Sequence, residues 1–445
     1  MCPTSSPPFP AGSVPPRACA CGAVHHVPVE AVVIGEDAIE QLGAWARGRH
    51  FTRPFVVMDA NTEEAVGRRV VRELSGEKLT VRTLCFPERD GLLADETSVA
   101  RLESALQAAE PDCLVAVGSG VITDVTRFVA SRTGREFVSV PTAASMDGYA
   151  SGVAAMQFGG MKTTFPAAAP VAIFADTVTV AAAPPDMARS GLGDLLGKAT
   201  ARVDWLMSHA LYGEPFCAEV ERRVIDPVTK AAADVGQILA GQPEAVRQLL
   251  HGLIESGVAM AMVGSSRPAS GCEHHASHFW DLLASQGRRS HAPHGLQVGY
   301  ATHFAMRLQQ YAFGGGVVTL AAPRLIGDGD GDGVDPWFAG HEADVRAVVE
   351  DKRRFASEHR AAWPTSRSGW RAVQARATEP MRLFPLVAGA LSAAGIPSQP
   401  GFLALDGATL RTTFRWANRI RSRYTVLDFL EGQGRLDEAI DVVLS

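Results

Sequence analysis

The 445-residue chain contains no long run of apolar residues. No stretch approaches the ~18 apolar residues that a membrane-spanning helix needs. The N-terminus has no basic segment followed by an apolar run, which excludes the pattern of a secretory signal. Residues 3–16 are instead rich in Pro, Ser and Gly, so we expect residues 1–18 to form a disordered arm.

The chain has no excess of positive charge and few cysteines. It holds 42 Lys and Arg against 48 Asp and Glu, a net charge of −6, which argues against a dedicated nucleic-acid binder. Seven cysteines, an odd number spread over 445 residues, exclude a disulfide scaffold and predict reduced thiols. We therefore expect a cytoplasmic protein with no nucleic-acid partner and no membrane span.

The first part of the chain does show a regular pattern, in which short β-branched runs alternate with amphipathic segments. We expect strands at residues 31–34, 55–59, 79–86, 113–117, 136–140 and 171–175, and helices at 36–48, 63–75, 98–109 and 122–133. This alternation predicts βαβ units and a mostly parallel sheet. Such sheets bind ligands beyond the carboxyl ends of their strands.

After Pro184 and Pro185 the strand pattern gives way to long amphipathic segments. We expect helices at residues 187–208, 218–239, 244–262, 273–286, 296–310 and 342–357. The predicted fold class is therefore α/β: a Rossmann-like N-terminal domain over residues 19–182, followed by an all-α C-terminal domain over residues 183–445. A cleft between two such domains is the expected place for a ligand.

Two predicted strand ends carry features of a nucleotide site. Gly118-Ser119-Gly120 joins an apolar strand to a helix start, where backbone N–H groups and the helix dipole favour phosphate. The next strand is followed by Pro141–Ser151, which contains several hydroxyls and Asp147. Asp59 ends another strand and is placed to bind a ribose 2′-OH, as in NAD sites. A plain tight turn and a loop capped by its own side chains remain alternatives.

Metal-type side chains gather in the predicted helical half. Asp194 and Lys198 are four residues apart, as are His274 and His278, and His294 precedes another helix. Two imidazoles and one carboxylate suit an open tetrahedral metal site. His275 is the alternative to His274. Their side chains point about 100° apart on the predicted helix, so only one of the two shares the face of His278.

A second group of possible ligands lies near the N-terminus. Cys19, Cys21, His25 and His26 are all of the metal-binding type. Their spacing is too short for a common zinc finger, so no second metal site is predicted there.

Five segments, read in order, resemble the sn-glycerol-1-phosphate dehydrogenase family. These are GSGVITD (118–124), PTAASMDG (141–148), GLGDLLGK (191–198), EHHASH (273–278) and HGLQVG (294–299). The family belongs to the superfamily of glycerol dehydrogenase, iron-containing alcohol dehydrogenases and 3-dehydroquinate synthase. The resemblance implies a dehydroquinate synthase-like fold over nearly the whole chain.

The resemblance also implies roles for individual residues. The NAD(P) pyrophosphate would lie against Gly118, Ser119, Gly120, Val121 and Ile122, and the nicotinamide side against Thr142, Ala143, Ala144, Ser145 and Ser151. Asp194, His274 and His294 would hold the metal. Asp147, Asp194 and His278 would contact the substrate. Lys198 falls where the iron-dependent relatives have a histidine, and His291 competes with His294 because the segment before it is longer than usual.

The activity implied is reversible reduction of dihydroxyacetone phosphate by NAD(P)H to sn-glycerol 1-phosphate, a step of phospholipid metabolism. The metal would be Zn²⁺ or Ni²⁺, Asp194 and His278 would be catalytic, and the protein would be a homo-oligomer. The substrate phosphate needs positively charged partners, and the candidates are Lys162, Lys198 and a stripe made of Arg411, Arg415, Arg419 and Arg423. The alternative interpretation of this stripe is a solvated helix face. The alternatives are a polyol dehydrogenase, a sugar-phosphate cyclase on the same scaffold, and a nucleotide sensor without catalysis.

Overall fold

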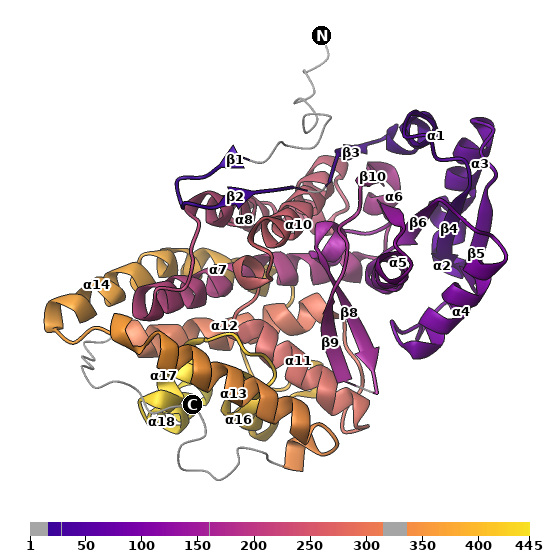
Figure 1. Cartoon of the computed structure of the whole chain (residues 1–445). Coiled ribbons are helices and arrows are strands. Elements are labelled where there is room, and N and C mark those ends of the chain that lie inside the picture. Colours follow the sequence, from indigo (N-terminus) through magenta and orange to yellow (C-terminus); the bar gives the residue numbers. More distant parts are fainter. Residues whose placement is uncertain (1–16, 28, 160, 315–335) are drawn as a thin grey trace. The chain divides into compact units, whose positions relative to one another are not determined.

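The computed structural model describes residues 17–27, 29–159, 161–314 and 336–445, and it divides into two compact units (Figure 1). The first unit holds residues up to 191 together with 236–265, and the second holds 192–235 and 266–445. Most of the predicted arm lies outside the described residues. No helix in the described ranges combines the length and apolar character that crossing a membrane requires.

The first unit is built on a six-stranded sheet in which every neighbouring pair is parallel. The strands, in spatial order, are β3 (Ala31–Gly35), β10 (Ala172–Asp176), β7 (Glu136–Pro141), β6 (Cys113–Gly118), β4 (Pro54–Asp59) and β5 (Arg82–Phe86). All six match predicted strands. Because β7, β6 and β4 are neighbours, their carboxyl ends meet at one edge of the sheet.

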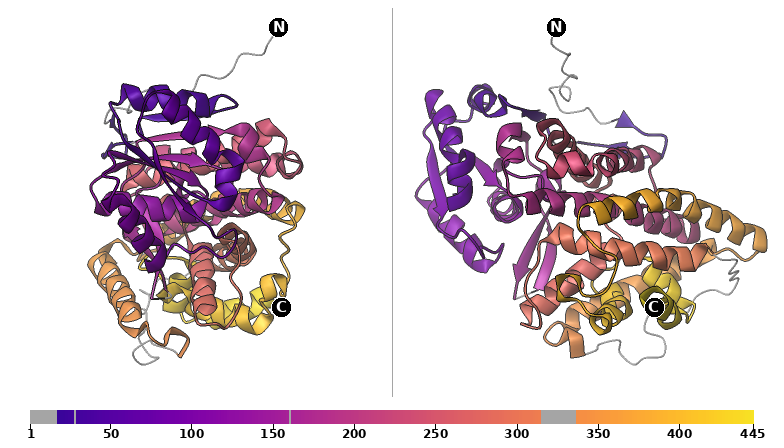
Figure 2. Two further views of the ribbon diagram at one scale, coloured as in Figure 1. Left: turned by 90° about the vertical axis from the view of Figure 1, so that its right-hand side faces the viewer. Right: turned by 180° about the vertical axis from the view of Figure 1, so that it is seen from behind.

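Helices cover both faces of this sheet (Figure 2). On one face α1 (Ala38–Gly48) and α3 (Arg68–Gly76) pack on alternate strand residues such as Val56 and Val115. On the other face α4 (Glu96–Gln107) and α5 (Gly120–Arg132) pack on the intervening residues. Burial on both faces explains the continuous apolar runs of the central strands.

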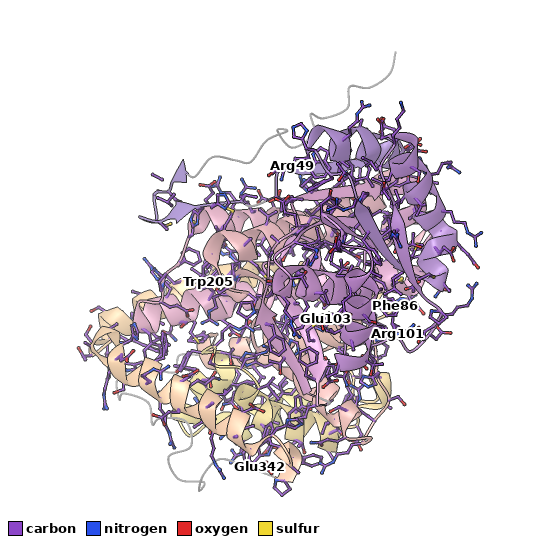
Figure 3. The ribbon with its side chains drawn as sticks, turned by 45° about the vertical axis from the view of Figure 1, so that its right-hand side comes forward. Arg49, Phe86, Arg101, Glu103, Trp205 and Glu342 are labelled. Carbon is purple, nitrogen blue, oxygen red and sulfur yellow. The ribbon has the colours of Figure 1, made fainter. Side chains whose placement is uncertain are left out.

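The edge strand β5 is covered differently. Its last residue, Phe86, is fully buried, and the guanidinium of Arg101 on α4 lies 4.6 Å from its ring centroid (Figure 3). Arg101 also forms an ion pair of 2.6 Å with Glu88. A cation over an aromatic face stabilises such a contact by about 0.5–1 kcal/mol.

The first unit also contains strands and one helix that the sequence pattern does not assign to it. β8 (Val153–Phe158) and β9 (Met161–Pro166) form an antiparallel hairpin, and Phe158 lies 5.3 Å from the ring centroid of Phe128 on α5. Helix α10 (Pro243–Val263) was placed by sequence in the helical domain. It belongs to this unit because it packs on η2 (Gly148–Ala150) and α6 (Thr177–Ala181).

The second unit is helical, and none of its described residues forms a strand. Its helices are the greater part of α7 (Pro185–Tyr212), then α8 (Ala218–Ala233), α11 (Cys272–Ser285), α12 (His294–Phe313), α13 (Glu342–Glu358), α14 (Arg367–Thr378), α15 (Phe384–Ala393), α16 (Gly407–Trp416), α17 (Val426–Gly432) and α18 (Leu436–Leu444). The single helix expected at 218–239 is interrupted at Asp234, where the backbone leaves helical geometry. The predicted fold class, a parallel α/β part followed by a helical part, is confirmed.

Aromatic residues form much of the core of the second unit. Trp205, Trp280 and Trp370 are almost completely buried. The indole N–H of Trp280 donates to Thr413 Oγ1 at 2.7 Å, so its polar atom is satisfied inside the core. Trp370 and Phe429 stack with ring centroids 5.7 Å apart. Such a rigid interior can hold metal ligands from separate helices in fixed positions.

Candidate functional site

Three helices of the second unit bring Asp194, His274 and His294 together. One donor atom from each residue lies within 4.8 Å of the other two. Asp194 comes from α7, His274 from the first turn of α11 and His294 from the start of α12. His274 Nε2 lies 3.5 Å from Asp194 Oδ1, and the two imidazole centroids are 5.3 Å apart. These are the three residues that the sequence selects as metal ligands.

Glycines allow α7 and α12 to approach closely enough for this arrangement. A Cβ atom built on Gly193 would lie 2.1 Å from the carbonyl oxygen of Gly295, and one on Gly299 would lie 2.8 Å from Gly193 Cα. Gly193 and Gly295 are immediate neighbours of Asp194 and His294 in the chain. The glycines of the GLGDLLGK and HGLQVG segments therefore set the distance between two of the three donors.

Neighbouring polar groups orient the two imidazoles. His274 Nδ1 lies 2.8 Å from Glu273 Oε1, which leaves Nε2 directed at Asp194. His294 Nδ1 lies 3.1 Å from Ser277 Oγ. Metal-binding histidines are held in this way by a carboxylate or hydroxyl on the second ring nitrogen. A carboxylate and two oriented imidazoles fit a divalent metal ion such as Zn²⁺.

The charges at the cluster also suit a cation. Burial alone would raise the pKa of Asp194, but the ammonium of Lys198, 2.6 Å from Oδ1, and the hydrogen bond from His274 lower it, so the carboxylate stays ionised. Burial and the charge of Lys198 act to lower the pKa of His274. Hydrogen bonds to Asp194 and Glu273 outweigh them and raise it. An ionised carboxylate beside two imidazoles suits a cation, although Asp194 and Lys198 are both fully buried.

Glu273 is expected to control metal affinity without touching the metal. Its Oε1 meets His274, and its Oε2 accepts from Thr200 Oγ1 at 2.8 Å. The variant Glu273→Gln loses the charge that fixes the imidazole, so we expect metal affinity to fall by about 10–100-fold. Competition with a chromogenic chelator measures this change. Glu358→Gln, at the exposed end of α13, is the control, and equal affinities of the two variants would contradict the role.

The other histidines of this region are placed differently. His278, one turn after His274, lies with its ring centroid 5.6 Å from that of His294 and 6.4 Å from that of His274. His275 is completely buried on another face, and burial lowers its pKa well below the usual value. Neither of its ring nitrogens has a hydrogen-bond partner within the described ranges. His291 is exposed. Neither His275 nor His291 belongs to the cluster of donors.

The first unit carries the predicted nucleotide loop at the carboxyl edge of its sheet. β6 ends at Gly118, Ser119 precedes the helix, and α5 begins at Gly120, so Val121 and Ile122 fall in its first turn. A Cβ on Gly118 would lie 2.6 Å from Ile122 Cβ, which requires glycine there. Ser119 Oγ lies 2.6 Å from Ser145 Oγ, so the two predicted loops meet.

Asp59 ends the neighbouring strand and caps the next helix. Its Oδ1 accepts from the backbone N–H of Thr62 at 2.8 Å. This contact fixes the carboxylate at the same sheet edge as Gly118. Capping of a helix is a structural role that the sequence pattern did not include for Asp59.

The loop from Pro141 to Ser151 is held by buried side chains. Thr142 donates its N–H to Gly118 O at 3.3 Å, and the Tyr149 hydroxyl donates to Ala143 O at 2.5 Å, beside Ala144. Ser190 Oγ donates to Ser145 O at 3.1 Å.

The second half of the loop is held in the same way. Ser256 Oγ donates to Asp147 Oδ2 at 3.2 Å, and Ser151 Oγ donates to Val153 O at 2.9 Å. Most of these contacts join residues distant in sequence.

Arg127 on α5 is the strongest of these anchors, and sequence reasoning missed it. The fully buried guanidinium donates to Tyr149 O at 3.1 Å, to Val153 O at 3.0 Å and also to Gly148 O. Its charge is balanced by Asp124 at 2.8 Å. The sequence feature that could have revealed this role is a single arginine on the apolar face of the helix predicted at 122–133.

Loss of Arg127 is expected to destabilise the first unit and loosen the loop. The variant Arg127→Met would leave buried carbonyl groups unpaired, at a cost of about 3 kcal/mol. Thermal denaturation and the KM for NAD(P)H measure the two effects. Arg132→Met, on the same helix with a side chain 56% exposed, is the matched control. A stability equal to that of the control would show that the anchor is dispensable.

In the basic stripe near the C-terminus, three of the four arginines pair with carboxylates, and the fourth, Arg423, donates to Ser266 Oγ. Arg411, Arg415 and Arg419 form ion pairs with Asp441, Asp437 and Glu431, respectively. The helix also ends at Trp416, so the four arginines do not share one continuous helix. The side chain of Lys162 lies outside the described part of the structure.

Arg421, which lies outside that stripe, has unused hydrogen-bond donors. Its Nε and Nη2 are buried, and neither has a partner among the described residues. Burial lowers the pKa of Arg421 to about 10, against the opposing charge of Asp281. Asp281 lies beside His278, with 3.9 Å between Oδ2 and Nδ1. Arg421 therefore brings positive charge to the region of Asp281 and His278.

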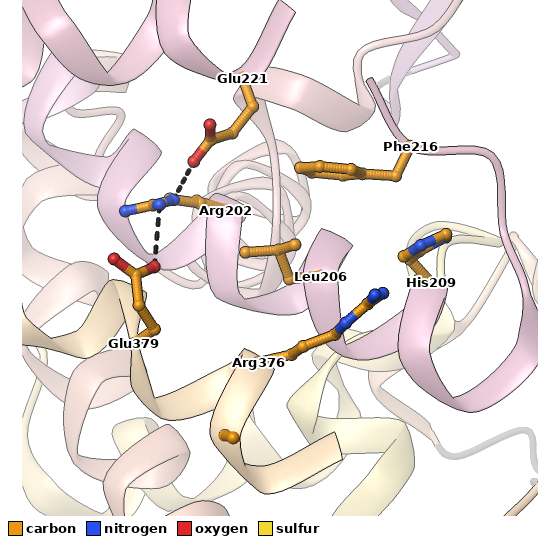
Figure 4. A pocket seen from close by; sticks show the side chains of 8 residues that line it. Arg202, Leu206, His209, Phe216, Glu221, Arg376 and Glu379 are labelled. Atoms are coloured by element: carbon orange, nitrogen blue, oxygen red, sulfur yellow. Dashed lines mark hydrogen bonds and ion pairs between the residues drawn. The ribbon is translucent and has the colours of Figure 1, made fainter. Parts of the chain in front are cut away.

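A separate cavity of about 510 Å³ lies elsewhere in the second unit (Figure 4). Its lining includes Leu206, Phe216 and Arg202, and Arg202 forms ion pairs with Glu221 and, at 3.0 Å, with Glu379. None of the metal donors lines it. Arg376 and His209 also line it, and His209 Nδ1 lies 2.7 Å from the carbonyl oxygen of Glu214.

Comparisons with known proteins agree with these features. The sequence profile of the iron-containing alcohol dehydrogenases matches residues 33–184. A glycerol-1-phosphate dehydrogenase [NAD(P)+] of Halalkalibacterium halodurans is 37% identical over 287 residues, 64% of this chain and 72% of that protein. One from Pyrococcus furiosus is 36% identical over 272 residues, 61% of this chain and 76% of that protein.

Solved structures show the same fold at low sequence identity. A probable glycerol dehydrogenase from Sinorhizobium meliloti has a TM-score of 0.61 at 19% identity, with 93% of this chain and 96% of that one covered. An iron-containing alcohol dehydrogenase from Thermococcus thioreducens has a TM-score of 0.60 at 14% identity, with 93% and 97% covered. With a relative 37% identical over most of its length, the chain belongs to the glycerol-1-phosphate dehydrogenase family.

Proposed function

We propose that the protein is a metal-dependent NAD(P)-linked dehydrogenase that reversibly reduces dihydroxyacetone phosphate to sn-glycerol 1-phosphate. The observation that carries this proposal is the cluster of Asp194, His274 and His294, in which the first two are buried and His294 is partly exposed. The relatives from Halalkalibacterium halodurans and Pyrococcus furiosus, both named glycerol-1-phosphate dehydrogenase [NAD(P)+], support it. When bound, the metal polarises the substrate carbonyl and the reduced nicotinamide supplies a hydride.

We assign the metal to Asp194, His274 and His294. Their oxygen and nitrogen donors suit Zn²⁺ best and also accept Ni²⁺. Asp194 additionally contacts the substrate in this proposal. Lys198, 2.6 Å from Asp194 Oδ1, keeps that carboxylate ionised and is assigned a contact with a substrate oxygen.

His278 is assigned the delivery of a proton to the substrate oxygen that becomes a hydroxyl. It is next to the metal donors but is not one of the three, and its side chain is 9% exposed. Asp281 Oδ2 lies 3.9 Å from Nδ1, where a carboxylate attracts a protonated imidazole. An imidazole titrates near neutral pH, so His278 can give up and regain a proton in each turnover.

The nucleotide is assigned to the sheet edge of the first unit. The backbone from Gly118 to Ile122 binds the pyrophosphate at the start of α5, where the helix dipole favours negative charge. Asp59 binds the adenosine ribose. The nicotinamide side is assigned to Thr142, Ala143, Ala144, Ser145 and Ser151, and Asp147 is assigned a substrate contact.

Arg421 is proposed to bind the substrate phosphate, because its guanidinium has buried donors without partners. The variant Arg421→Met should raise the KM for dihydroxyacetone phosphate at least tenfold, since a charged hydrogen bond contributes about 1.5–3 kcal/mol. Metal affinity should not change. Arg411→Met, with a side chain 52% exposed and paired to Asp441, is the control. An unchanged KM in Arg421→Met would remove this residue from the phosphate site.

The assay that tests the function follows the absorbance of NADH or NADPH with dihydroxyacetone phosphate as substrate. We expect oxidation of the cofactor, its loss on chelation, and recovery with Zn²⁺ or Ni²⁺. Dihydroxyacetone without phosphate should react at least tenfold less efficiently. Equal efficiency would favour a polyol dehydrogenase. Turnover with no net change in cofactor would favour a cyclase, and no turnover with any metal would refute the proposal.

The cellular location and the oligomeric state are two further parts of the proposal. We propose a cytoplasmic location, in keeping with the cysteines, which form no disulfide among the described residues. A homo-oligomer remains a prediction, and light scattering of the purified protein tests it.

A further inference from the structure

A short hairpin of the first unit presents two thiols and an imidazole to one another. β1 (Arg17–Ala18) and β2 (Val24–His25) pair antiparallel, and Cys19 and Cys21 lie in the turn between them. The turn is closed by Gly22 N–H donating to Cys19 O at 2.9 Å, and Gly22 has a φ of +86°. A left-handed residue here favours glycine, so the tight turn is built into the sequence.

The donor atoms lie near the spacing of a tetrahedral metal site. Cys21 Sγ lies 3.3 Å from His25 Nε2, and one donor from each of Cys19, Cys21 and His25 lies within 4.8 Å of the others. Around a tetrahedral Zn²⁺, neighbouring sulfur and nitrogen ligands lie about 3.6–3.8 Å apart. Neither cysteine is in a disulfide. Small adjustments of the side chains would place all three donors around one ion.

His25 is oriented as a metal ligand. Its Nδ1 lies 2.9 Å from the carbonyl oxygen of Met262 near the end of α10. A carbonyl only accepts, so Nδ1 carries the hydrogen and the lone pair is on Nε2, facing Cys21. Ligating histidines characteristically donate their second N–H to a carbonyl or carboxylate. His25 is 9% exposed, whereas the adjacent His26 is exposed.

We propose that Cys19, Cys21 and His25 bind a structural Zn²⁺ ion. This site is additional to the Asp194 cluster and independent of the function proposed above. Binding converts the two thiols to thiolates and releases their two protons to solvent, with no change in oxidation state. A fourth donor completes the tetrahedron. The ion fixes the hairpin onto α10 through the hydrogen bond from His25 to Met262.

The sequence did not predict this site because the C-x-C-x₃-H spacing is shorter than a zinc finger allows. Finger spacings assume ligands on two separate elements. Here one turn supplies both thiols and the adjacent strand supplies the imidazole. The interpretation that set these residues aside therefore rested on spacing rather than on the hairpin that brings them together.

Cobalt substitution of the full-length protein tests the proposal. A thiolate bound to Co²⁺ gives an intense charge-transfer absorption in the near ultraviolet, and the Asp194 cluster, which has no thiolate, cannot produce it. We expect this absorption in the wild type and in Asp194→Ala/Lys198→Met, which removes the first metal site together with its buried ion pair. It should be lost in Cys19→Ser/Cys21→Ser and retained in His26→Ala, the exposed neighbour. Persistence of the absorption in the double cysteine variant would overturn the proposal, as would its absence from the wild type.

Two further measurements do not depend on whether the double cysteine variant folds. Zn²⁺ should protect Cys19 and Cys21 of the wild type from alkylation, as read by mass spectrometry, and chelation should expose them. The wild type should also hold about two zinc ions per chain and the double variant Asp194→Ala/Lys198→Met, which removes both buried charges, about one. Equal alkylation with and without Zn²⁺ would contradict the site. Exchange of each remaining cysteine (Cys2, Cys85, Cys113, Cys217 and Cys272) for serine shows whether one supplies the fourth ligand.

Discussion

Replacing Asp194 by alanine is expected to abolish metal binding in the second unit and to reduce turnover roughly a thousandfold. Asp194 supplies the single carboxylate of the Asp194–His274–His294 cluster, and its pKa is lowered so that it is always ionised. A Lewis acid stabilises developing charge by several kcal/mol, and about 4 kcal/mol corresponds to a thousandfold change in rate. Metal analysis and steady-state kinetics measure the two losses.

This substitution has a complication, because it leaves the buried Lys198 ammonium without its carboxylate. Removing one partner of a buried ion pair costs about 3–5 kcal/mol, so Asp194→Ala alone risks unfolding. The double variant Asp194→Ala/Lys198→Met removes both charges and should fold, yet remain without metal. Asp186→Ala, at the start of the same helix with a side chain 71% exposed, is the control. A folded double variant that retains full metal and full turnover would refute the ligand assignment.

Replacing Gly193 by alanine is expected to weaken metal binding by at least tenfold while every ligand stays in place. The new Cβ would lie 2.1 Å from Gly295 O, a backbone atom that cannot rotate away. α7 and α12 would have to separate by about 1 Å, which carries Asp194 away from His294. Overpacking of this kind costs about 1–3 kcal/mol, and a shift of 1 Å in a site can cost about a hundredfold in rate. Isothermal titration with Zn²⁺ and thermal denaturation measure the effects.

The matched control for Gly193→Ala is another helical glycine of the same unit. Gly389 lies in α15, and a Cβ built on it meets no atom within 4 Å. Gly389→Ala should leave metal affinity unchanged and raise stability by about 0.5–1 kcal/mol, because alanine favours the helix. Equal metal affinities of the two variants would mean that the close contact of α7 and α12 does not set the geometry of the donors.

Much of the fold follows from local sequence patterns. β6 reads as an unbroken apolar run because helices cover both faces of the sheet, and its assignment from sequence is confirmed. The hairpin β8–β9 was missed because only one of its faces is buried, and small residues such as Ala154 carry that pattern weakly. The place of α10 in the first unit was also missed, since periodicity shows that a helix is amphipathic but not which partner it covers.

The site was predictable where spacing on one element carries the information. His274 and His278 share a helix face, and the structure places both rings near His294. Contacts between distant segments left no such pattern. The sequence shows Gly193 without revealing that Gly295 faces it, and it shows Arg127 without the carbonyl groups of Tyr149 and Val153 that it binds.

The discontinuity of the second unit has a consequence for biosynthesis. Its residues 192–235 and 266–445 are interrupted by a segment, 236–265, that belongs to the first unit. A chain emerging from the ribosome therefore exposes Asp194 well before His274 and His294 exist, and the metal cluster can close only after α12 has been made. An isolated fragment starting near residue 183 would also carry α10 without the surface that α10 covers. The two units are thus expected to mature together rather than one after the other.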